Sequence, residues 1–73
     1  MDMLELFHIF KVAIEDEKRA QRTYEEGMRL TEERPDLQKI FFELLQEEQK
    51  HEKILNELYQ KHKEEIETRL KNS

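Results

Sequence analysis

The single proline of the 73-residue chain, Pro35, lies in the stretch Thr31-Glu32-Glu33-Arg34-Pro35-Asp36. Proline disfavours helical geometry at the residue before it, while its own fixed φ suits the first turn of a new helix. Asp36 places a carboxylate at the positive end of the dipole of that helix. One helix therefore ends near this stretch and another begins within it.

Two long helices are predicted on the two sides of this stretch. Asp2 can cap the first helix, which we expect over about residues 2–31, followed by a turn over about 32–34. The second helix is expected over about residues 35–71, because neither proline nor glycine interrupts it. We therefore expect an all-α chain with a single domain, residues 1–73, folded as an antiparallel helical hairpin.

The composition excludes several classes of protein. Charged residues make up 42% of the chain and its formal net charge is -5, which disfavours nucleic acid and anionic membranes as partners. The absence of cysteine excludes disulfides, thiolate zinc sites, iron–sulfur clusters and a cysteine nucleophile. No apolar run approaches the roughly 20 residues that span a bilayer, and the first residues lack the basic start of a signal peptide. We expect a cytoplasmic protein.

Each predicted helix carries an apolar stripe with ionisable residues on it. At about 100° per residue, Glu17 lies at the centre of the first stripe and Glu48 at the centre of the second, with His51 one turn later. The other members of the first stripe are Leu6, Phe10, Ala13, Ile14, Ala20, Gln21, Tyr24 and Met28. The other members of the second stripe are Leu37, Phe41, Leu44, Leu45, Leu55, Tyr59 and Ile66.

Folding the hairpin at the turn brings the ionisable residues of the two stripes to one level. With Tyr24 facing Leu44, Glu17 lies level with both Glu48 and His51. An unpaired charge between apolar layers would cost several kcal/mol, so these groups need compensation. Carboxylate oxygen and imidazole nitrogen suit iron, manganese or zinc, and Glu-x-x-His places both side chains on one helix face. We predict that Glu17, Glu48 and His51 are metal ligands.

The hairpin also requires a partner. Two helices of this length cannot enclose a core, and one chain supplies only three ligands. Two copies related by a two-fold axis would form a four-helix bundle with four carboxylates and two imidazoles, a set that matches two divalent cations. We therefore expect a homodimer or a larger even-numbered assembly that holds two non-haem iron ions per dimer, with manganese or zinc as alternatives.

Several short stretches combine the expected ligands with their neighbours on the helices: Ala13-Ile14-Glu15-Asp16-Glu17, Ala20, Tyr24, Asp36-Leu37, Phe41 to Leu45, and Glu47-Glu48-Gln49-Lys50-His51-Glu52. Together they resemble the rubrerythrin-type branch of the ferritin-like superfamily, over roughly residues 8–59. The resemblance implies that Glu17, Glu48 and His51 bind the metals and that Tyr24 places a hydroxyl beside them. It also implies an oxidoreductase of the ferroxidase or peroxidase type, which oxidises Fe(II) with dioxygen or peroxide in iron storage or in defence against oxidative stress.

The sequence departs from the family pattern in two ways. Typical members carry both helix pairs in one chain, and many rubrerythrins add a cysteine-rich rubredoxin domain. The first difference makes the expected site intermolecular, as in short ferritin-like proteins stored in encapsulin shells. An encapsulin shell is a conceivable partner here, but no separate targeting peptide after Lys71 supports one. The second difference removes a built-in electron conduit.

Other interpretations stay open at the level of the sequence. The three ionisable residues can instead fix register in a metal-free helical module that dimerises or docks on a partner's helices. For Gln21 we expect a hydrogen bond beside the ligands, and for Glu52 a solvated carboxylate. His8 is expected at the surface and His62 at the end of the bundle.

Overall fold

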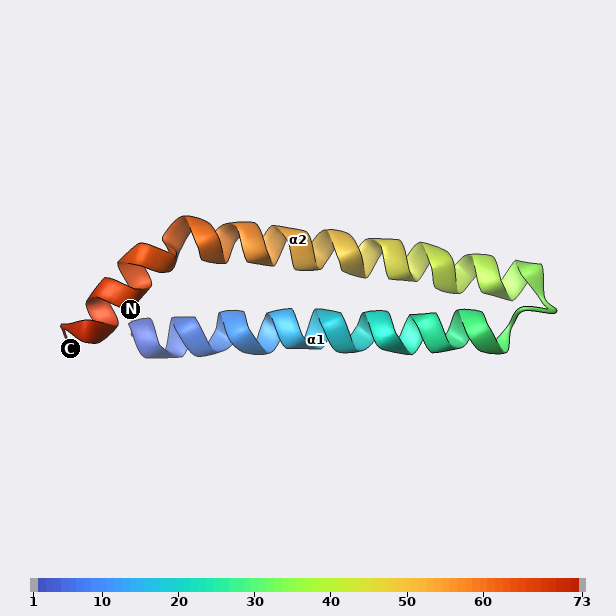
Figure 1. Ribbon diagram of the computed structural model, residues 1–73, viewed down its shortest axis with the longest axis horizontal. Coiled ribbons are helices and arrows are strands. Elements are labelled where there is room, and N and C mark those ends of the chain that lie inside the picture. The colour runs from blue at the N-terminus through green and yellow to red at the C-terminus, as the bar shows by residue number, and fades with distance from the viewer. Residues whose placement is uncertain (1, 73) are drawn as a thin grey trace.

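The computed structural model describes residues 2–72 and consists of two antiparallel helices joined by a short turn (Figure 1). Helix α1 spans Met3–Leu30 and helix α2 spans Pro35–Lys71. No strand occurs in the described range. The predicted all-α hairpin is confirmed, and α1 is one residue shorter at each end than expected. The single domain predicted over 1–73 includes both terminal residues, which lie outside the described range.

Local side-chain chemistry sets the starts of both helices. The Asp2 carboxylate accepts hydrogen bonds from the amides of Leu4 (2.9 Å) and Glu5 (3.3 Å), so it caps α1 as predicted. Arg34 has φ -127° and ψ 82°, which is outside helical geometry, as expected for the residue before a proline. Its guanidinium donates to both carboxylate oxygens of Asp36, at 3.2 and 3.0 Å. This hydrogen bonding lowers the pKa of Asp36.

Helix α2 is longer than α1 and reaches beyond it. The two helices have 37 and 28 residues, and the C-terminal part of α2 bends toward the N-terminal end of α1 (Figure 1). Ile66 lies near the C-terminal end of α2 and is 1% exposed. It lines a cavity together with Met3 and Leu6 of α1. The bend therefore covers the open end of the hairpin with apolar side chains.

Aromatic rings fill the space between the helices. Phe10 packs beside Tyr59 with ring centroids 5.7 Å apart, and Tyr24 packs beside Phe41 at 6.4 Å. The expected level of Tyr24 is right to within one turn, but its ring partner is Phe41 rather than Leu44. Leu44 is 37% exposed, because it lies on the flank of α2 and not on the line that faces α1.

At Gly27 the two helices leave no room for a side chain. A Cβ atom at this position would lie 2.7 Å from the ring of Phe41, well inside van der Waals contact. Gly27 is buried, and its backbone has no positive φ. The residue is therefore required for space and not for an unusual backbone conformation.

Most of the exposed large hydrophobic side chains lie on one side of the hairpin. Within residues 2–72, ten are exposed by 36% to 69%, and helical geometry places eight of them on the same side. We call this side the apolar face; its members are Ile9, Val12, Leu30, Leu37, Ile40, Leu44, Ile54 and Leu58. The remaining two, Leu4 and Phe42, project elsewhere. No helix within residues 2–72 has the length and apolar character needed to cross a membrane.

Candidate metal centre

Three potential metal ligands converge near the middle of the hairpin. Glu17 comes from α1, and Glu48 and His51 come from successive turns of α2. Each offers one ligand atom, and these atoms all lie within 4.8 Å of one another. His51 Nδ1 is 3.6 Å from Glu17 Oε2 and 3.6 Å from Glu48 Oε2. The structure thus brings together the three residues that the sequence placed at one level.

Burial differs between the carboxylates and the imidazole. The Glu17 and Glu48 side chains are 21% and 20% exposed, so both lie largely between the helices. The His51 side chain is 51% exposed. On the helical wheel of α2, His51 lies on the same side as the apolar face. The cluster is therefore closed toward the hairpin and open on the side where the hydrophobic residues are exposed.

One carboxylate oxygen in the cluster lacks a hydrogen bond. Glu17 Oε2 is buried and accepts none from any residue in the described range. Its distance of 3.6 Å to His51 Nδ1 exceeds the normal length of a hydrogen bond. A buried carboxylate oxygen without a donor costs free energy. A cation at this position would remove that cost, so the residues present fit a metal ion.

The donor set has a definite chemical preference. Two carboxylate oxygens and one imidazole nitrogen suit iron, manganese or zinc. Three donors are fewer than these metals usually take, so a metal held by one chain would need further ligands. Those ligands must come from water, from a reactant or from another protein chain.

Tyr24 lies two turns along α1 from Glu17. Seven residues of helix correspond to about 10.5 Å of rise, although a long side chain can span part of that distance. The ring packs beside Phe41, and the described residues provide no hydrogen-bond partner for the hydroxyl. Tyr24 also lines a surface hollow with Thr23 and Ala20. Its role beside a metal stays a prediction.

A hydrogen-bonded group next to the cluster agrees with the sequence expectation for Gln21 and differs from it for Glu52. Gln21 Nε2 donates to Glu52 Oε1 at 2.6 Å, and Asn56 Nδ2 donates to Glu52 Oε2 at 3.5 Å. Glu52 is half-buried, so the solvated carboxylate expected here is wrong. The sequence did contain a signal, because Gln21 and Glu52 each follow a predicted ligand by four residues.

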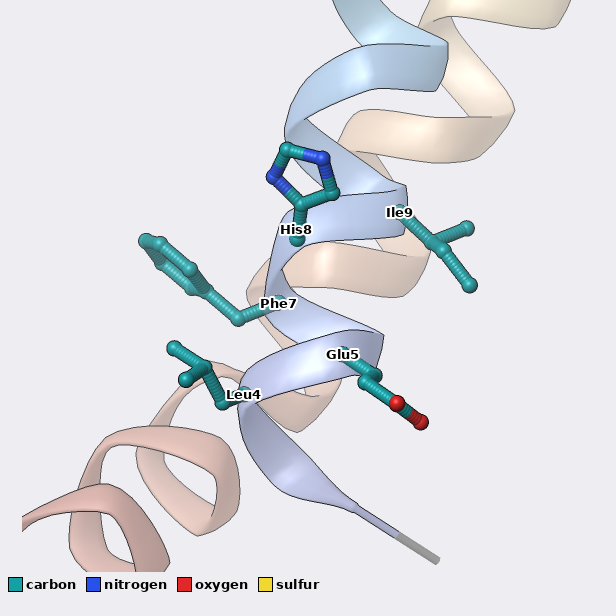
Figure 2. A pocket seen from close by; sticks show the side chains of 5 residues that line it. All are labelled: Leu4, Glu5, Phe7, His8 and Ile9. Carbon is teal, nitrogen blue, oxygen red and sulfur yellow. The ribbon is translucent and has the colours of Figure 1, made fainter.

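The other two histidines lie away from the cluster. His62 Nδ1 is 3.9 Å from Glu65 Oε2, toward the end of the hairpin as expected. His8 is exposed and lines a hollow of about 580 Å³ on the first turns of α1 (Figure 2). The Glu5 carboxylate and the His8 ring point away from each other there (Figure 2). This hollow therefore offers no converging pair of metal donors.

The similarity of the chain to known proteins bears directly on this cluster. A family model described as rubrerythrin matches residues 8–73, which is most of the chain and includes all three candidate ligands. The chain belongs to the rubrerythrin family. Rubrerythrins typically bind iron, in agreement with the oxygen and nitrogen donors of the cluster. Searches of curated proteins and of solved structures found no match.

Proposed function

We propose that two copies of this chain form a four-helix bundle around two non-haem iron ions and oxidise Fe(II) with dioxygen or peroxide. The observation that carries the proposal is the convergence of Glu17, Glu48 and His51, with one buried carboxylate oxygen left unpaired. Two such clusters contain four carboxylates, whose charge matches two divalent cations. Membership of the rubrerythrin family supports the same chemistry.

The position of the cluster supports a symmetric dimer. Glu17 lies at the midpoint of α1, which spans Met3–Leu30. A two-fold axis perpendicular to the helices at this level would bring both clusters together and pair the hairpins over their whole length. His51 and the apolar face lie on one side of the hairpin, so the same contact would cover both. The partner would then supply the ligands that one chain lacks.

The exposed area of the hairpin also favours a partner. The chain exposes 5817 Å², whereas size scaling gives about 4,900 Å² for a compact monomer of its mass. The excess is close to the roughly 800 Å² that each partner buries in an interface of standard size. A second copy bound to the apolar face would bury about as much exposed surface as this excess.

Each residue of the cluster has a distinct part in this function. Glu17 and Glu48 would bind iron through oxygen, and these hard ligands favour the more highly charged ferric product. His51 would bind through a ring nitrogen as the neutral imidazole. Iron, when bound, supplies the one-electron redox chemistry.

Anaerobic loading with Fe(II) tests the proposal directly. We expect about one iron per chain by elemental analysis after gel filtration, and oxygen consumption when air is admitted. The Glu48→Ala variant should lose both iron binding and oxygen consumption, because it lacks one ligand in each copy of the chain. Glu57→Ala is the matched control, since it removes an exposed carboxylate from the same helix. Failure to bind Fe(II), or equal binding by Glu48→Ala, would overturn the proposal.

The exposed apolar face also suits a second function, a metal-free module for dimerisation or docking. Under that alternative the cluster only fixes register, and replacing all three residues by leucine would keep or raise stability and preserve biological activity. The di-iron proposal predicts that this triple variant stays helical and loses Fe(II) oxidation. Elemental analysis of protein purified without chelator separates iron from a structural zinc or manganese ion.

A further inference from the structure

We propose that Gln21, Glu52 and Asn56 form a clamp that positions Glu17 relative to Glu48 and His51 and thereby sets the affinity for metal. The inference rests on the proposed function, because metal binding is the property that the clamp controls. The three clamp residues are positioning residues and none of them is a ligand in this proposal.

The bond between Gln21 and Glu52 joins the two helices directly. It is 2.6 Å long and part-buried, and it links residues 31 positions apart. Among the described residues it is the one hydrogen bond between side chains of α1 and α2. The clamp is therefore a specific polar link in an interface that otherwise consists largely of apolar contacts.

The clamp lies directly beside the cluster along the hairpin. Gln21 follows Glu17 by four residues, and Glu52 follows Glu48 by four residues, so each lies about one turn from a candidate ligand. Apolar contacts are non-directional and tolerate small shifts, whereas a hydrogen bond fixes distance and angle. A shift of α2 by one helical turn, about 5.4 Å, would break this bond and separate Glu17 from His51.

The clamp lies on one side of the hairpin, and the cluster is open on the other side. Helical geometry places Gln21 and Asn56 on the edge away from His51 and from the apolar face. Both oxygens of Glu52 face amide donors: Oε1 accepts a short hydrogen bond from Gln21 at 2.6 Å, and Oε2 accepts a long, weak one from Asn56 at 3.5 Å. Glu52 would have to give up these bonds to reach a metal, so its carboxylate positions the helices instead of binding the ion.

Breaking the bond should weaken metal binding while the fold remains. We expect Gln21→Leu to lower the affinity for Fe(II) on the order of ten-fold, the scale typical for residues that support metal ligands. The measurement is an anaerobic calorimetric titration with Fe(II), accompanied by circular dichroism of the metal-free protein. Glu52→Leu breaks the same bond from α2, so a folding failure in one variant leaves the test intact.

Two further variants separate positioning from general stability. Gln38→Leu removes the hydrogen bond from Gln38 Nε2 to the Met28 carbonyl, 3.2 Å long and close to the turn, and should leave Fe(II) affinity within about two-fold. The double variant Gln21→Glu with Glu52→Gln exchanges donor and acceptor, and should restore most of the affinity. Recovery of Fe(II) affinity in this double variant would show that the hydrogen bond itself, and not the shape of either side chain, sets the affinity.

The outcomes distinguish the two proposals. Wild-type protein that binds no Fe(II) would overturn the proposed function and the clamp with it. Wild-type protein that binds Fe(II), with Gln21→Leu and Glu52→Leu binding equally well, would overturn the clamp alone. An equal loss in Gln38→Leu, or no rescue by the exchanged pair, would likewise reduce the clamp to a general contribution to stability.

Discussion

At the scale of single residues, Glu17 combines partial burial with a carboxylate oxygen that accepts no hydrogen bond. In the metal-free protein this group opposes folding, because desolvation is not repaid by a donor. With a cation bound, the same group would favour the folded state. Its contribution to stability should therefore change sign on metal binding.

The substitution Glu17→Leu tests whether Glu17 destabilises the metal-free protein and stabilises the metal-bound protein. We expect the metal-free variant to be more stable than wild type by about 1–3 kcal/mol, since an unpaired polar group is replaced by an apolar one. Saturating Fe(II) should raise the melting temperature of wild type and leave that of the variant unchanged. Urea unfolding and thermal melts measure both effects. The control Glu57→Leu, at an exposed position, should stay within about 0.5 kcal/mol of wild type.

The close packing of Gly27 against Phe41 leads to a second prediction for a single residue. Alanine favours helix over glycine by about 1 kcal/mol, but its Cβ would lie 2.7 Å from the Phe41 ring. Overpacking of this kind costs about 1–3 kcal/mol, so Gly27→Ala should destabilise the hairpin in urea unfolding. In a Phe41→Leu background the clash is relieved and the same substitution should become stabilising. A stabilising effect in both backgrounds would contradict the close packing of Gly27 on Phe41.

At the scale of elements, the start of α2 depends on the pair formed by Arg34 and Asp36. The guanidinium lies just before the helix and the carboxylate in its first turn, where the dipole also favours negative charge. The hydrogen bonds from Arg34 lower the pKa of Asp36, so the folded state holds the charged carboxylate more strongly than the unfolded chain does.

The pair gives a pH-dependent prediction for Asp36→Asn. Because the folded pKa is lowered, the stabilisation is complete above the unfolded pKa of about 3.9 and is lost as the pH falls through the folded pKa. Wild type should therefore melt about 1–3 °C above the variant at pH 6, and the two should converge in strong acid. Glu33→Gln, which removes a turn carboxylate outside this pair, is the control. A difference that persists in acid would contradict the assignment.

The arrangement of the two helices shows which parts of the site the sequence could predict. The heights of Glu17, Glu48 and His51 were predictable, because rise per residue and the position of Pro35 fix them once the hairpin forms. The ring partner of Tyr24 was not, since it depends on the rotation of α2 about its own axis. A hydrogen bond from Gln21 beside the ligands was expected, but its partner Glu52 was not, because the pairing depends on the rotation of α2 and on the side-chain conformations together.

At the scale of the whole molecule, the hairpin is a thin rod with extents of 56 × 15 × 15 Å. Of its large hydrophobic residues in the described range, Met3, Leu45 and Ile66 are buried, and of these Ile66 alone is fully buried. So small a buried core leaves little margin for independent stability. Association through the apolar face would enlarge the core and complete the metal centre in one step.

Charge placed on the apolar face should block this association. We expect Leu44→Glu to shift the sedimentation mass from twice the 9.1 kDa of the chain to that of the monomer, and to abolish Fe(II) binding. Phe42→Glu is the matched control, because Phe42 is 45% exposed but projects away from the apolar face. A monomeric wild type, or equal dissociation of both variants, would contradict the proposed dimer.

The two helices, the turn between them and the level at which three ionisable residues meet could all be derived from the order of the amino acids. These follow from local rules: the backbone restrictions imposed by Pro35, the cap at Asp2 and the helical period of apolar residues. Tertiary structure alone decided the packing of Gly27 on Phe41, the bend that covers Ile66, and the link from Gln21 to Glu52. Such contacts depend on the rotation and curvature of whole helices, which are set by the sum of many weak packing contacts and not by any short stretch of residues.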